Sequence, residues 1–143
     1  MRTVPYASAI GSLMYVMLCI RPDICFVVGL VSCYQSNLGP IHWQAVKRIL
    51  CYLRGTSNFI LCYQGGDMRL KGYIDADWGN DLDESKSTSG YVFILGGGAI
   101  SWCSKKQDYI TLSTMEAEYI TNSIVVQEAI WLMGFLKDLN ITP

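Results

Sequence analysis

The sequence predicts an α+β fold, with helices in the first third, a meander of strands after them and a long helix last. Three observations predict it. Apolar residues recur at helical spacing up to residue 55. From there to residue 104 they form short, strand-like runs separated by turn residues, and helical spacing then returns. Strands and helices that are segregated along a chain are typical of α+β proteins, with helices packed against one sheet. The 143 residues are enough for one ordinary domain or about one and a half smaller units.

The first third is expected to be helical. Pro22 and Asp23 suit the first turn of a helix, through the fixed φ of proline and the negative charge of aspartate. Gly55 is placed to end another helix, in which Trp43 begins a stripe of apolar side chains. The predicted helices span residues 6–20, 24–35 and 42–54.

The centre of the chain is expected to form strands. Apolar runs are separated by turn residues, among them a row of three glycines from Gly96. Ser113 and Glu116 then have the spacing of a capping box, which predicts the start of the last helix. The predicted strands span residues 59–63, 70–77, 91–95 and 99–104. Turn chemistry around Gly65 predicts a boundary that leaves residues 1–64 in a helical segment and 65–143 in a second domain.

Composition excludes several classes of protein. Apolar residues make up 51% and charged residues 16%, so a disordered chain is excluded. The net charge of −1 provides no overall field for a polyanion, so any such partner must bind a local patch. The apolar stretch 13–34 is interrupted by Arg21, Pro22 and Asp23, which argues against a membrane span.

The cysteines do not indicate a metal site. The six cysteines include no CxxC pair, and His42 is the only histidine in the sequence, which argues against zinc. We expect small buried thiols in a reducing compartment and therefore an intracellular protein, cytoplasmic or nuclear, that is not secreted.

Acidic residues gather at two places where chemistry could occur. Asp75 and Asp77 stand at the end of a predicted strand, and Glu116 and Glu118 open the last helix. Carboxylates are the ligands that Mg²⁺ prefers. Residues two apart on a helix point to nearly opposite sides, and Glu116 has a capping role, so Glu118 is the better candidate ligand. The alternative is that these acids only solvate a loop and a helix start.

Eight strings of residues carry a resemblance to a known family. In order, they are VPYASAIGSLMY (4–15), RPDI (21–24), HWQAVKRIL (42–50), YLRGT (52–56), YIDADW (73–78), KSTSGY (86–91), GGAISW (97–102) and EAEYI (116–120). Together they resemble the Pol polyproteins of copia-type LTR retrotransposons: the first four resemble the C-terminal end of the reverse transcriptase, and the last four the ribonuclease H domain. The resemblance covers nearly the whole chain in unbroken order.

The resemblance implies a truncated ribonuclease H-like mixed sheet with a packed helix after a reverse-transcriptase connection segment. It also implies hydrolysis of RNA in RNA/DNA hybrids by two magnesium ions, with Asp75 and Glu118 as catalytic residues and metal ligands. The family pattern has a third aspartate beyond residue 143. We therefore expect an incomplete two-ion site and weak or no activity from this chain without the remainder of the Pol polyprotein.

Basic and hydroxyl side chains are candidates for contact with nucleic acid. Lysine near a phosphate adds affinity without reading the base sequence. The candidates around the sheet are Lys86, Ser87, Thr88, Lys105 and Lys106, and those on the third helix are Lys47, Arg48 and Arg54. A solvated polar face explains the helix equally well. The rival hypothesis for the whole chain is a non-catalytic remnant or nucleic-acid-binding module.

Overall fold

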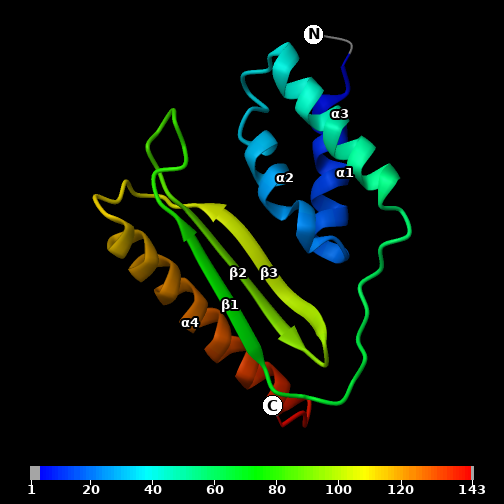
Figure 1. The fold of residues 1–143 in the computed structure, drawn as a ribbon, viewed down its shortest axis with the longest axis vertical. Coiled ribbons are helices and arrows are strands. Elements are labelled where there is room, and N and C mark those ends of the chain that lie inside the picture. The colour runs from blue at the N-terminus through cyan, green and yellow to red at the C-terminus, as the bar shows by residue number, and fades with distance from the viewer. Residues whose placement is uncertain (1–3, 143) are drawn as a thin grey trace. The chain divides into compact units, whose positions relative to one another are not determined.

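The first unit of the structure contains the helices that the sequence predicts. The computed structural model describes residues 4–142 and divides at Leu61 and Cys62 into two units (Figure 1). In the first, α1 spans Tyr6–Cys19, the 3₁₀ turn η1 spans Pro22–Ile24, α2 spans Cys25–Ser32 and α3 spans Pro40–Gly55. The second predicted helix therefore begins with a 3₁₀ turn at Pro22 and ends three residues early.

The three helices of this unit enclose a small apolar core. Tyr6 is almost fully buried, and its hydroxyl donates a hydrogen bond of 2.7 Å to the carbonyl oxygen of Val31, which ties α1 to the end of α2. The ring of Tyr6 also lies 6.3 Å from that of Trp43 on α3. The other buried apolar side chains of the unit are Ile10, Leu13, Met17, Ile24, Cys25, Val28, Val31, Val46 and Ile49.

Arg21 is a buried charge that the fold fully pairs. Its guanidinium donates to both carboxylate oxygens of Asp23, at 2.9 and 2.7 Å, and to the carbonyl and hydroxyl oxygens of Thr56, at 3.2 and 2.7 Å. It also lies over the rings of Tyr52 and Phe59. These contacts join the turn before α2 to the end of α3.

The second unit contains a three-stranded sheet. β1 spans Lys71–Asp77, β2 spans Thr88–Leu95 and β3 spans Gly98–Lys106, in the order β1-β2-β3 and antiparallel throughout. The predicted mixed sheet is thus wrong for the described residues. Short connections reverse the chain between these strands, whereas a parallel pair needs a long crossover.

The turn between β2 and β3 is built from glycines. Gly96 and Gly97 have φ of +60° and +82°, values that glycine adopts without the penalty of a side chain. The predicted strand 59–63 does not form, and the chain just after it meets the turn and not a partner strand. The backbone N–H groups of Gln64 and Gly65 both donate to the carbonyl oxygen of Gly96.

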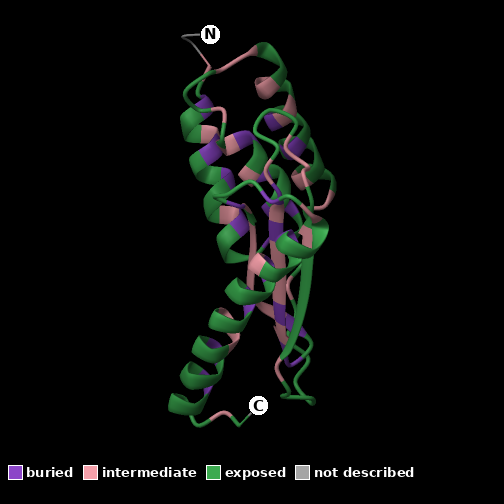
Figure 2. Cartoon of the chain, turned by 90° about the vertical axis from the view of Figure 1, so that its left-hand side faces the viewer, coloured by how far each residue is buried: buried purple, intermediate pink, exposed green. Residues whose placement is uncertain are grey.

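Helix α4, Thr114–Asp138, packs against β1 and β2. Its start is capped as predicted, since the Ser113 hydroxyl accepts a hydrogen bond from the Glu116 N–H. The buried positions of α4 are Ala117, Thr121, Val125, Leu132 and Leu136. They form a narrow stripe, and most of the helix is exposed (Figure 2). Ile124 and Phe135 lie outside this stripe and are 41% and 47% exposed.

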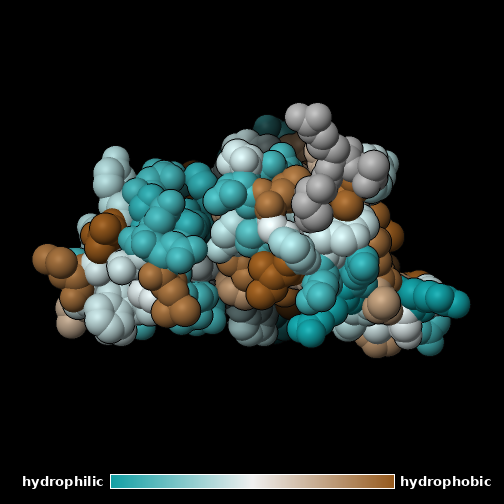
Figure 3. Space-filling view, turned by 90° about the horizontal axis from the view of Figure 1, so that it is seen from above, coloured by the Kyte–Doolittle hydropathy of each residue, from teal (hydrophilic) through white to brown (hydrophobic). Residues whose placement is uncertain are grey.

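The described surface carries many apolar side chains, and patches of them lie between polar ones in Figure 3. The cysteines share this exposure. Cys25 is buried and Cys103 half-buried, but Cys19, Cys33, Cys51 and Cys62 are exposed. The prediction of buried thiols is therefore wrong for four of the six. A helix buries only one stripe, and apolar residues outside that stripe stay at the surface.

Candidate functional site

Asp75 lies in β1, an edge strand of the described sheet, opposite Gly90 of β2. Its side chain is exposed. Facing residues of antiparallel strands share a face, and neighbours along a strand alternate between faces. The face that Asp75 occupies can therefore be read from its strand neighbours.

The register places Asp75 on the sheet face that α4 does not cover. Ala76 pairs with Ser89, and the Ser89 hydroxyl forms a hydrogen bond of 2.7 Å with that of Thr121 on α4. Ala76 and Ser89 therefore point toward the helix. Asp75, one residue along from Ala76, points the other way, as does Asp77.

Glu118 is also exposed, although its neighbour Ala117 is fully buried against the sheet. Glu116 takes part in the cap, as the sequence predicts, but its carboxylate accepts a hydrogen bond of 2.7 Å from the Leu112 N–H and not from the Ser113 N–H of a full capping box. The structure thus separates the two glutamates by role. Glu118 is left at the surface of α4.

These carboxylates do not form a magnesium site in the described residues. No group of three or more histidine, cysteine, aspartate or glutamate side chains between residues 4 and 142 is placed to hold a metal ion. Asp75 and Glu118 belong to different sides of the sheet, and each is exposed. Two such carboxylates do not fit a two-ion site, which needs several oxygen ligands converging on one point.

The loop between β1 and β2 carries the largest group of paired charges in the second unit. Lys106, at the end of β3, pairs with Asp81 and lies 3.5 Å from Glu84, while Lys86 lies 2.8 Å from Glu84. The hydrogen bond from Lys106 lowers the pKa of Asp81, and that from Lys86 lowers the pKa of Glu84. Two of the predicted nucleic-acid contacts, Lys86 and Lys106, are therefore held in ion pairs.

The other predicted contacts differ in exposure. Lys105 is exposed and Thr88 is half-buried. Ser87 is fully buried, and its hydroxyl accepts from the Gly79 N–H and bonds the Thr111 hydroxyl at 2.9 Å. Ser87 is thereby removed from the surface on which a nucleic acid could lie.

A buried polar network next to Ser87 was missed by sequence reasoning. Gln107 is 5% exposed, and its Nε2 donates to the Ser89 hydroxyl at 2.9 Å and to the Ala117 carbonyl at 3.0 Å. The Thr121 hydroxyl joins the same network. Isolated Gln, Ser and Thr residues give no signal of burial in a sequence, because these types are mostly exposed.

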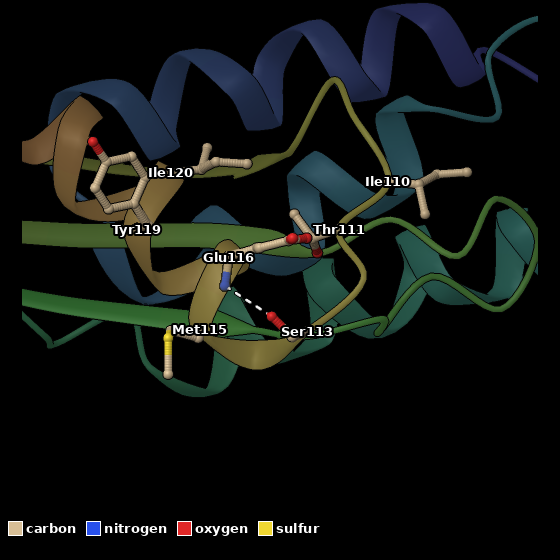
Figure 4. A pocket seen from close by; sticks show the side chains of 7 residues that line it. All are labelled: Ile110, Thr111, Ser113, Met115, Glu116, Tyr119 and Ile120. Carbon is tan, nitrogen blue, oxygen red and sulfur yellow. Dashed lines mark hydrogen bonds between the residues drawn. The ribbon is translucent and has the colours of Figure 1, made fainter.

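A hollow of about 480 Å³ opens at the start of α4 (Figure 4). Its lining combines the capping residues Ser113 and Glu116 with apolar side chains. The lining residues are Ile110, Thr111, Ser113, Met115, Glu116, Tyr119 and Ile120. Asp75 and Glu118 are not among them, so the hollow is separate from the predicted acidic site.

Known proteins resemble the chain over almost all of its length. It is 55% identical over 141 residues, 99% of the chain, to the retrovirus-related Pol polyprotein from transposon TNT 1-94 of Nicotiana tabacum. It is 39% identical over 137 residues, 95% of the chain, to the retrovirus-related Pol polyprotein from transposon RE2 of Arabidopsis thaliana. The chain belongs to the retrotransposon Pol polyprotein family. It spans 11% and 9% of the lengths of these two Pol polyproteins.

A third relative of this Pol chain has a similar length. The secreted RxLR effector protein 161 of Plasmopara viticola is 48% identical over 133 residues, which cover 92% of the chain and 94% of that protein. No family model matches the chain, and no solved structure matches it. None of the helices between residues 4 and 142 is long and apolar enough to cross a membrane.

Proposed function

We propose that this Pol segment joins the end of a reverse transcriptase to a ribonuclease H-like domain that acts on RNA/DNA hybrids. The observation that carries the proposal is the 55% identity to a Pol polyprotein over 99% of the chain. The α+β order of the second unit, with three strands before one long helix, is compatible with it. The site of action is intracellular, where a Pol polyprotein would meet its nucleic acid.

Asp75 and Glu118 are proposed as ligands of magnesium in the complete Pol protein. Their residue type supports this, because Mg²⁺ prefers carboxylate oxygens. Because the two residues belong to different sides of the sheet, binding of an ion requires further ligands and a different position of the Glu118 side chain. The segment by itself is therefore expected to have little or no activity.

Cleavage of a labelled RNA/DNA hybrid in magnesium tests this proposal. The chain should be compared with a version that continues into the sequence that follows the matched segment in the TNT 1-94 polyprotein. We expect the longer protein to cut the RNA strand and Asp75→Asn to lower its rate at least about 100-fold, because ligands of one site act as a unit. Glu118→Gln should have a similar effect.

Asp77→Asn is the matched control, since Asp77 lies on the same strand and the same face as Asp75. Its rate should stay within about twofold of the unchanged protein. A longer protein that does not cut, or one that cuts equally well without Asp75, would contradict the proposal.

A second candidate is a nucleic-acid-binding module without turnover. The Plasmopara viticola relative favours it, because that protein consists of little more than the matched segment. Retardation of a hybrid in a gel, with no cleavage by the longer protein, would support this second function over the first.

A further inference from the structure

The two units of the chain have opposite charge. Residues 1–61 contain five basic residues and one acidic residue, Asp23, whereas residues 62–143 contain six basic and eleven acidic residues. The near-neutral total hides this division. The first unit therefore carries an excess of positive charge, and the second carries an excess of negative charge.

The single acid of the first unit is already used. Asp23 binds Arg21 through both carboxylate oxygens and also accepts a hydrogen bond from the Tyr52 hydroxyl. No other carboxylate side chain exists in residues 1–61 to balance the remaining cations. The uncompensated charge of the described part of this unit is that of Lys47, Arg48 and Arg54.

These three cations lie together on α3. Successive helical residues are turned by about 100°, so all three project from the half of α3 that faces away from the buried residues Val46 and Ile49. All three are exposed, and none forms an ion pair among residues 4–142. We call Lys47, Arg48 and Arg54 the basic face of α3.

We propose that the basic face of α3 binds the phosphate backbone of a nucleic acid. This inference rests on the proposed function and names the surface of the chain that holds the nucleic acid. Lys47 and Arg54 are two helical turns apart, about 10 Å along the axis. Duplex DNA carries one charge per about 1.7 Å, so about six phosphates span that distance. Because the phosphates are closely and evenly spaced, all three cations can contact phosphates in many positions of the protein along the duplex. An acidic peptide contacts all three only when its carboxylates match the positions of the cations.

The basic face is suited to binding without sequence readout. Arginine forms forked hydrogen bonds with phosphate, and lysine acts as a point charge. Gln44 and Cys51, on the same side of α3, are also exposed and carry no acidic charge that would repel a phosphate. The binding therefore depends on salt and not on base sequence.

Salt-dependent binding of a fluorescent 20-base-pair DNA duplex in EDTA tests the proposal. The full chain is compared with the triple variant Lys47→Gln, Arg48→Gln and Arg54→Gln. Three lost phosphate contacts should lower the slope of log affinity against log salt by about 2.7. Between 50 and 200 mM salt, the unchanged chain should then lose about 40-fold more affinity than the variant.

The matched control removes three cations from the second unit through Arg69→Gln, Lys71→Gln and Lys137→Gln. It has the same net charge as the triple variant and should keep the slope of the unchanged chain. An unchanged slope in the α3 variant, an equal loss in the control, no duplex binding at 50 mM salt, or stronger competition by polyglutamate than by unlabelled DNA would each overturn the proposal.

The design separates this inference from the proposed function. EDTA and a DNA duplex remove the need for cleavage, so Asp75→Asn should bind like the unchanged chain. If the hybrid is not cleaved, the proposed function fails but binding through α3 can still be observed. If the α3 variant binds like the unchanged chain, the binding proposal fails but the cleavage experiment is unaffected. Circular dichroism of each variant should match that of the unchanged chain, because all substituted side chains are at the surface.

Discussion

Replacement of Arg21 by methionine is expected to destabilise the first unit. Methionine has a similar length and keeps apolar contact with the rings of Tyr52 and Phe59. It removes the two hydrogen bonds to Asp23 and the two to Thr56. The Asp23 carboxylate then loses its cation, and the end of α3 loses its tie to the turn before α2.

The size of the effect follows from burial. Breaking a buried ion pair costs about 3–5 kcal/mol, because one charge is left without a partner. The Arg21 side chain is 9% exposed, but that of Asp23 is 35% exposed, so water partly replaces the lost partner. We therefore expect a loss of about 2 kcal/mol in the free energy of unfolding, below the range for a fully buried pair.

Amide hydrogen exchange followed by mass spectrometry measures this loss within the intact chain. A decrease of about 2 kcal/mol corresponds to about 30-fold faster exchange of the protected amides of α1 and α3. The Arg21 contacts all lie between residues 21 and 59, so amides of α4 serve as an internal control.

Arg21→Lys is the graded control. Lysine keeps the charge but cannot form the fork, so we expect about half the loss in the free energy of unfolding. Exchange in α1 and α3 that stays within about twofold of the unchanged chain after Arg21→Met would refute the reasoning, since it would mean that the pair makes no net contribution to stability.

Three further predictions concern single groups. The guanidinium beside Asp23 lowers the pKa of that carboxyl from 3.8 to about 2, so its stabilisation is present above about pH 4 and is lost as the pH falls through 2. After allowance for solvent exposure this amounts to about 1 kcal/mol, which urea unfolding of the first unit at pH 5 and pH 2 should show and Asp23→Asn should abolish. Gly98→Ala places a Cβ 2.5 Å from the Cys62 carbonyl oxygen and should lower the stability of the second unit by about 2 kcal/mol in thermal unfolding. The Cβ added by Gly134→Ala on α4 meets nothing within 4 Å, so this substitution should raise the stability of the second unit by about 0.5 kcal/mol. Equal effects of Gly98→Ala and Gly134→Ala would contradict the close contact at Gly98. Ser113→Ala removes the cap of α4 and should cost about 1 kcal/mol, with faster exchange confined to its first turn; unchanged exchange there would speak against the cap.

Local patterns predicted most of the secondary structure. Helical spacing identified α1, α3 and α4, and Ser113 marked the start of α4 because a cap is a contact between residues three apart. The strand predicted at residues 59–63 failed for the opposite reason. An apolar run becomes a strand only when another strand pairs with it, and the backbone of Gln64 and Gly65 pairs with the turn at Gly96.

The candidate site was predicted by residue type and not by placement. Asp75 and Glu118 stand on the predicted strand and helix, but no local pattern indicates which face of each element is covered. The covered faces depend on how α4 lies on the sheet, which contacts such as that between Ser89 and Thr121 determine. Those contacts join residues more than 30 positions apart, beyond the reach of any local pattern.

The sequence by itself determined the composition of each element, the family and the division of charge between the first 61 residues and the rest. These properties depend on residue identity and on spacings within one element. Only the tertiary structure decided that Ser87 is buried, that Lys106 pairs with Asp81, and that Asp75 lies on the face without the helix. Burial, ion pairing and the direction in which a side chain points depend on packing between distant segments. The residues within one element do not determine which distant segment will cover it.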